Sequence, residues 1–172
     1  MSSQIQIMNY DPRWPEVFRR EVDRIRTLLG CRALQIEHTG STSVPGLAAK
    51  PIINILLVVA DSSDEPAYVP ILERGGYSLR IREPNWHEHR MFKGSAPDIN
   101  LHVFSSGCPE INRILSFRDR LRSNGADRDL YERAKRDLAE KEWADVQDYA
   151  DAKTAVITGI LARTALKSGF VG

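Results

Sequence analysis

Residues 36–59, IEHTGSTSVPGLAAKPIINILLVV, predict a strand, a loop of small residues and a second strand. The loop runs from Gly40 to Lys50, carries the hydroxyls of Ser41, Thr42 and Ser43, and ends on the lysine. Glycine lets backbone N–H groups come close to an anion, because it has no side chain and tolerates unusual dihedral angles. The second strand is almost continuously apolar, which is typical of a central strand covered on both faces. The stretch therefore predicts that a phosphate or a nucleotide is held beside a buried strand.

The sequence before and after this stretch first alternates between strand and helix and then becomes helical. We expect strands at Ile5 and Ile7, 34–38, 77–82, 90–93 and 99–104, a helix from Asp11-Pro12 to Gly30, and a helix between 61–64 and Gly75-Gly76. After Pro109 we expect one helix to Ser123, a break at Asn124-Gly125, a helix capped by Asp127, and a last helix through 149–161. No Pro/Gly-rich linker divides the chain. The prediction is a single α/β (α+β) domain, 1–172, sheet-rich over 1–105 and helical over 109–168.

Composition limits the classes of partner. The 172 residues carry a net charge of +1, so no global field favours nucleic acid or an anionic membrane. No apolar run is long enough to span a bilayer, and no basic stripe indicates sequence-specific nucleic-acid binding. Cys31 and Cys108 form no CxxC motif and are expected to be reduced thiols in a cytoplasmic protein. A dimer through the C-terminal helices is compatible with the sequence, but no pattern demands one.

Four histidines, His38, His87, His89 and His102, lie in the part of the chain that contains the loop. His102 shares a strand face with Asn100, and His87 shares a face with His89 if residues 86–90 are extended. Converging imidazoles would bind Zn²⁺ or another transition metal, whereas separate hydrogen-bonded histidines explain the same spacing without a metal. His102 is also a candidate for phosphate binding or acid–base catalysis.

Other polar residues are candidates for the same site. Arg118 and Arg122 are four residues apart and share one helix face, for which a solvated charged face with an internal ion pair is the usual explanation. Tyr149 and Lys153 are also four apart, with packing against the sheet edge as the alternative to ligand binding. Asn54 interrupts an apolar strand and needs hydrogen-bond partners, which either a ligand or the loop would supply.

These motifs resemble the signature of the GrpB family. The resemblance rests on HTGSTSVPGLAAKPII at 38–53, NLHV at 100–103, FRDRLR at 117–122, and Tyr149 with Lys153, and it covers almost the whole chain. The family is similar to the nucleotidyltransferase superfamily, and domains related to this family occur fused to dephospho-CoA kinases. The resemblance therefore implies a polymerase-β-palm-like mixed sheet with flanking helices and a helical C-terminal part.

The resemblance also implies where metal ligands would stand. In the superfamily a Gly-Ser pair precedes Asp-x-Asp on a strand, and a third carboxylate on a later strand completes the site for two Mg²⁺ ions. Position by position, Gly40-Ser41 match the pair, Asn54 and Leu56 stand at the two aspartates, and Asn100 or His102 stands at the third carboxylate. These neutral groups do not supply the charged oxygen ligands that Mg²⁺ requires.

Three functions remain open from the sequence. In the first, the loop with His38 and Lys50 binds a nucleotide or another phosphorylated small molecule, and the resemblance implies that Arg118, Arg122 and Lys153 assist. If this protein is an enzyme, nucleotidyl transfer is the implied reaction, with His102, Asn54 and Asn100 as the candidate catalytic residues. In the second, the protein is a non-catalytic binding or regulatory module without the metals. In the third, a transition metal on His87, His89 and His102 serves a hydrolase.

Overall fold

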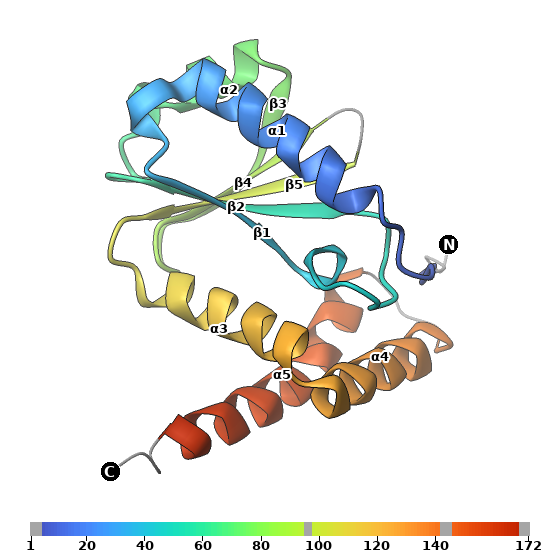
Figure 1. Cartoon of the computed structure of the whole chain (residues 1–172). Helices are drawn as coiled ribbons and strands as arrows, with labels where there is room; N and C mark the ends of the chain where they lie inside the picture. The colour runs from blue at the N-terminus through green and yellow to red at the C-terminus, as the bar shows by residue number, and fades with distance from the viewer. Residues whose placement is uncertain (1–4, 95–97, 142–145, 169–172) are drawn as a thin grey trace.

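The computed structural model describes residues 5–94, 98–141 and 146–168. Its sheet has five strands in the order β1-β2-β5-β4-β3 (Figure 1). The strands are β1 Gln35–Thr39, β2 Ile53–Val59, β3 Tyr77–Glu83, β4 His89–Gly94 and β5 Ile99–Ser105. Strands β2 and β5 are parallel, and the other neighbouring strands are antiparallel. The predicted α/β class with a mixed sheet is confirmed.

Helices cover both faces of the sheet (Figure 1). Helices α1 Trp14–Leu29 and α2 Val69–Arg74 lie on one side, and α3 Pro109–Ser123, α4 Gly125–Ala139 and α5 Val146–Ser168 lie on the other. Short 3₁₀ turns occur at Gly30–Arg32, Ser41–Ser43 and Glu65–Ala67. The C-terminal part is helical, as the sequence predicts, and the structure places its helices as a layer on one face of the sheet.

Strand β2 is covered on both faces, as its apolar sequence predicts. Its residues Ile53, Ile55, Leu57 and Val59 belong to the large core beneath α1 and α2. Leu56 and Val58 point to the opposite face and pack with Phe104 and Ile111, on the side of α3. We call these surfaces of the sheet the α1 face and the α3 face. The side chains of β2 alternate between them because successive residues of a strand point in opposite directions.

The beginning of the chain differs from its prediction. The expected strand at Ile5 and Ile7 is absent, and Met8 forms only an isolated bridge with Ala49. Helix α1 begins at Trp14 rather than at Asp11-Pro12. The Asp11 carboxylate accepts a hydrogen bond from the Arg13 backbone N–H instead of capping a helix that starts at Pro12. Local polar contacts of this kind compete with helix initiation.

Two other local predictions are wrong. Residue Leu34 lies outside β1 and its side chain is exposed, so it does not share the buried face of Ile36. Helix α4 is capped by Asn124, whose side chain accepts from the Asp127 backbone N–H at 2.9 Å, rather than by Asp127. The Asp127 carboxylate instead pairs with arginines of α3 and α5, contacts that join helices remote in sequence.

Candidate functional site

The loop between β1 and β2 is held against the sheet by its own small residues. Gly40 has φ +70°, and a Cβ at this position would lie 2.7 Å from Asn54 Nδ2, so only glycine fits. The Thr42 hydroxyl donates to the Ile52 carbonyl at 3.0 Å and contacts His38 Nε2 at 3.0 Å. Thr42 and Ser43 are buried, and the Ser43 hydroxyl donates to the Gly40 carbonyl. These two hydroxyls therefore stabilise the loop, while Ser41 is half-buried.

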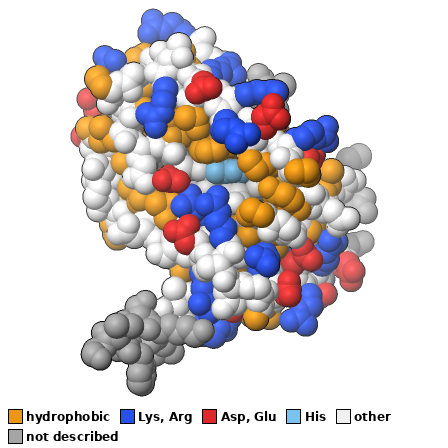
Figure 2. Space-filling model, viewed as in Figure 1, with side chains coloured by type: hydrophobic (Ala, Val, Ile, Leu, Met, Phe, Trp, Pro, Cys, Tyr) orange, Lys and Arg blue, Asp and Glu red, His pale blue; other side chains and the backbone are white. Residues whose placement is uncertain are grey.

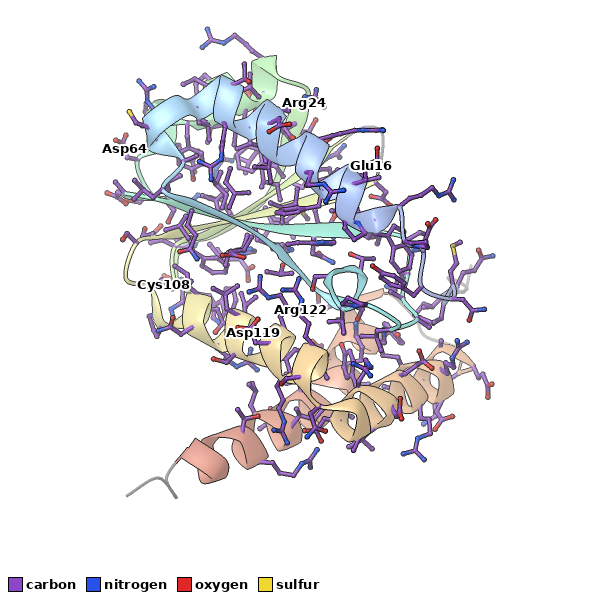
Figure 3. The ribbon with its side chains drawn as sticks, viewed as in Figure 1. Glu16, Arg24, Asp64, Cys108, Asp119 and Arg122 are labelled. Atoms are coloured by element: carbon purple, nitrogen blue, oxygen red, sulfur yellow. The ribbon has the colours of Figure 1, made fainter. Side chains whose placement is uncertain are left out.

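Two arginines of α3 hold the loop and the end of β1. Arg122 Nε donates to the Ser43 carbonyl at 2.9 Å, from the side of α3 that faces the loop (Figure 3). Arg118 donates to the His38 carbonyl at 3.1 Å and forms an ion pair with Glu37 at 2.7 Å. The structure thus brings both predicted arginines to the loop, where they bind backbone carbonyls and the Glu37 carboxylate.

Three predicted catalytic residues lie together on the α3 face. Asn54 of β2 is directly paired with Asn100 of β5, and Leu56 is paired with His102. His102 Nε2 lies 3.4 Å from Asn54 Oδ1. Burial, followed by the nearby His89 and Lys93, lowers the pKa of His102 to about 3, so its imidazole is neutral at physiological pH. Among the described residues, the buried Asn100 Oδ1 has no hydrogen-bond partner.

The histidines do not converge as one set. His38 pairs with Ile55 and stacks on Phe18 of α1, so it lies on the α1 face, opposite His102. Burial first, then Arg122 and Arg118, lowers the pKa of His38 to about 4. The extended segment considered for residues 86–90 is wrong, because residues 86–88 form a turn in which His87 has φ +56°.

The other two histidines form a hydrogen-bonded chain. His89 Nδ1 lies 2.8 Å from a Glu83 carboxylate oxygen, and His89 Nε2 lies 3.0 Å from His102 Nδ1. The two imidazole planes lie within 19° of each other. The nitrogens that face each other are therefore engaged in one hydrogen bond.

The residues at the implied metal positions do not fit a two-metal site. Asn54, Leu56, Asn100 and His102 offer amides, an alkyl group and a neutral imidazole, whereas Mg²⁺ prefers charged oxygen ligands. Throughout residues 5–94, 98–141 and 146–168, no three His, Cys, Asp or Glu side chains are grouped so that they could hold a metal ion. Both cysteines are free thiols.

Three lysines from separate segments gather beside the loop, and we call Lys50, Lys135 and Lys153 the lysine cluster. The ammonium groups of Lys50 and Lys153 lie 4.9 and 4.6 Å from the centre of the Tyr149 ring. Lys135 is 2% exposed, donates to the Ala48 carbonyl, and lies 5.1 Å from the centre of the Tyr131 ring. Within the described part of the chain, none of the three forms an ion pair with a carboxylate.

Burial and mutual repulsion weaken the protonation of these lysines. Burial, followed by the Lys153 ammonium, lowers the pKa of Lys135 to about 7. Burial, followed by Lys50, lowers the pKa of Lys153 to about 8. The pKa of Lys50 is also lowered, by burial and then by Lys93, which is paired with Asn100 across the sheet. Lys93 therefore connects the lysine cluster with Asn100 of β5 and its neighbour Asn54 of β2.

Lys135 and Tyr131 are absent from the residues that the sequence predicts for the site. A signal for them exists, because YERAK at 131–135 repeats the Tyr-x-x-Ala-Lys spacing of YADAK at 149–153. Tyrosine and lysine four residues apart lie on one face of a helix, so each pair can present an ammonium beside a ring. The repeat becomes a site only in the folded protein, where α4 and α5 bring both lysines to the same loop.

The surface charge elsewhere is mixed. On the face shown in Figure 2, Lys and Arg side chains are interspersed with Asp and Glu. Within the described segments, no helix is both long and apolar enough to cross a membrane. This face as a whole therefore carries no excess of one charge, in contrast to the lysine cluster.

Comparison with known proteins gives the family. The model of the family described as GrpB protein matches residues 4–163. The chain is 62% identical to "UPF0157 protein BH1888" of Halalkalibacterium halodurans, over 94% of this chain and 83% of that protein. A crystal structure of "conserved protein GrpB" from Enterococcus faecalis is 30% identical, with a TM-score of 0.79 and coverage of 92% and 99%. A structure of the Cid1 poly(U) polymerase is 11% identical, with a TM-score of 0.49 and coverage of 76% and 45%. The chain belongs to the GrpB protein family.

Proposed function

We propose that this protein binds a nucleotide or another phosphorylated small molecule at the loop from Gly40 to Lys50. The observation that carries the proposal is the lysine cluster. Lys135 is buried, Lys50 and Lys153 are half-buried, and like charges that lie together in such a region without carboxylate partners raise the free energy of the unliganded protein. A phosphate group supplies the negative charge that the described contacts of the cluster do not give it, and further acceptors beside the Ala48 carbonyl that Lys135 already uses.

The polar residues beside the cluster suit the same ligand. Ser41 is half-buried beside Gly40, at the end of the loop closest to Asn54. Asn54 and Asn100 offer amide groups on neighbouring strands, and Lys93 adds a further ammonium on the next strand. These groups give an anion several hydrogen-bond donors, and the Asp98 carboxylate nearby is already paired with Lys93. A location in the cytoplasm, where nucleotides are abundant, is part of the proposal.

We infer that this site serves binding rather than two-metal nucleotidyl transfer. The neutral groups at positions 54, 56, 100 and 102 favour this function, because the two-metal reaction needs carboxylates to align the attacking and leaving oxygens. A transferase that works without these metals is the second candidate, because His102 and Asn54 lie together on the α3 face, although a pKa of about 3 makes His102 a weak base.

Calorimetric titration with ATP, CTP, GTP and UTP, each with Mg²⁺ and with EDTA, tests the proposed function. We expect at least one nucleotide to bind the wild type and to bind the Lys50→Met/Lys153→Met variant at least roughly tenfold more weakly, because two charge-assisted contacts are lost. The control is Lys141→Met, which makes the same chemical change at an exposed lysine. Absence of binding of all four nucleotides, and of ribose 5-phosphate and pyrophosphate, would refute the proposal.

A further inference from the structure

The side chains of the proposed site indicate how many phosphate groups its ligand carries. In the metal-dependent reaction, two divalent ions neutralise the phosphate chain, and carboxylates hold those ions. In this chain Asn54 and Leu56 stand at the positions of two of the carboxylates, and Asn100 or His102 stands at the third. The residues that would hold the ions are therefore missing, while positive charge is supplied by side chains from the loop, α4 and α5.

The charges around the lysine cluster are predominantly positive. Lys135 faces Lys50 from the loop and Lys153 from α5, and on its own helix it has Glu132 and Arg136 as neighbours. The Glu132 carboxylate is engaged by the Ala48 backbone N–H at 2.8 Å. Lys153 faces Lys50, and Lys50 faces Lys93, whose ammonium is paired with Asp98 at 3.0 Å. Three ammonium groups thus share a partly buried region, a charge that exceeds what a single phosphate monoester neutralises.

We propose that the lysine cluster binds a chain of two or more phosphates directly, with its ammonium groups in the place of divalent metal ions. This inference rests on the proposed function and specifies its ligand. Each added phosphate brings further negative charge to the ammonium groups, so affinity increases from a nucleoside monophosphate to the triphosphate. A Mg²⁺ ion that is already bound to the phosphates competes with the lysines for the same oxygens, so magnesium weakens binding.

Binding also has a proton signature. At slightly alkaline pH, Lys135 and Lys153 are only partly protonated in the free protein, because burial and the neighbouring ammonium groups lower their pKa. A polyphosphate favours the charged form of both amines, so the complex takes up protons from the buffer. A site that used a metal ion held by carboxylates would not need this uptake.

The test is calorimetry on the full chain with tripolyphosphate and with AMP, ADP and ATP. Each titration is made with EDTA and with excess Mg²⁺, at pH 8 in several buffers of different ionisation enthalpy. We expect binding in EDTA, affinity that rises with phosphate number, and binding roughly tenfold or more weaker in Mg²⁺. The buffer series should show an uptake of about one proton per ATP at pH 8 and less at pH 6.

Variants identify the source of the protons. Lys135→Met should reduce the proton uptake at pH 8, whereas Lys141→Met should leave it as in the wild type. Binding of a nucleotide that requires Mg²⁺, or that takes up no proton at pH 8, would overturn this inference and leave the proposed function standing. Failure of every phosphorylated probe to bind would overturn both. Circular dichroism confirms that each variant is folded before it is titrated.

Discussion

Replacing Lys135 by methionine should make the stability of this protein less dependent on pH. Its amine has a pKa of about 7 in the folded protein, against 10.5 for an ordinary lysine. Between these values the unfolded chain binds more protons than the folded one, so the free energy of unfolding rises with pH. Below about pH 7 the amine is charged in both states, and the full cost of burying the ammonium is present.

The size of the effect follows from the two pKa values. For one group with these values, the free energy of unfolding rises by about 3 kcal/mol between pH 6 and pH 9. In Lys135→Met this contribution is absent, so the stability difference between variant and wild type should shift by about that amount across the same range. The mean stability also changes, because the hydrogen bond to the Ala48 carbonyl is lost.

Urea unfolding followed by circular dichroism, at intervals from pH 6 to pH 9, measures the difference. Groups distant from Lys135 titrate equally in both proteins, so the change in the stability difference with pH reports Lys135 together with its effect on Lys50 and Lys153. Lys141→Met is the matched control and should give a curve parallel to that of the wild type. Parallel curves for Lys135→Met and the wild type would show that Lys135 has an ordinary pKa and would refute the electrostatic account of the cluster.

Three further results are expected. Gly40→Ala should lower the free energy of unfolding in urea by about 1–3 kcal/mol, through backbone strain and the approach of the new Cβ to Asn54. The loss should exceed that of Gly46→Ala, where φ is also positive but a Cβ meets open space, and equal losses would contradict the close packing of the loop. Arg118→Met should lower the free energy of unfolding by about 1–3 kcal/mol, because the Glu37 carboxylate and the His38 carbonyl at the end of β1 lose their partner. A double-mutant cycle with Glu37→Gln that shows no coupling energy would argue against the ion pair. His102→Gln should lessen the loss of stability as pH falls from about 6.5 towards 4, because the pKa of the buried imidazole is lowered to about 3 and the unfolded chain binds the proton more readily. If the melting temperature of the variant falls with pH as steeply as that of the wild type, His102 is not buried as the neutral imidazole.

Part of the candidate site could be predicted because it follows from local sequence. The hydroxyl-rich loop begins at a glycine with positive φ, and the apolar run after it forms a strand buried on both faces. Asn54, Asn100 and His102 were predicted as candidates, and the register of β2 with β5 places them on one face. Alternation along strands makes such placements predictable once the strands are recognised.

Other residues depended on contacts between distant segments. His38 occurs beside the loop in sequence, yet the register with β2 turns its side chain to the α1 face. His87 is separated from the other histidines by a turn with positive φ, which the sequence does not predict because His87 and Glu88 are not glycines. Asp127 has the composition of a helix cap but instead joins three helices through two arginines.

The sequence by itself determined the five strands of the sheet, the loop and most of the helices, because hydrophobic periodicity and glycine conformations act over a few residues. The sequence also identified Lys50 and Lys153 as candidates, from a family motif. Only the tertiary structure placed Lys135 with them, since the burial of an ammonium group depends on which helices pack around it. The lowered pKa values of the cluster arise from that packing and from the proximity of charges 85 and 103 positions along the chain from Lys50, which no local pattern encodes.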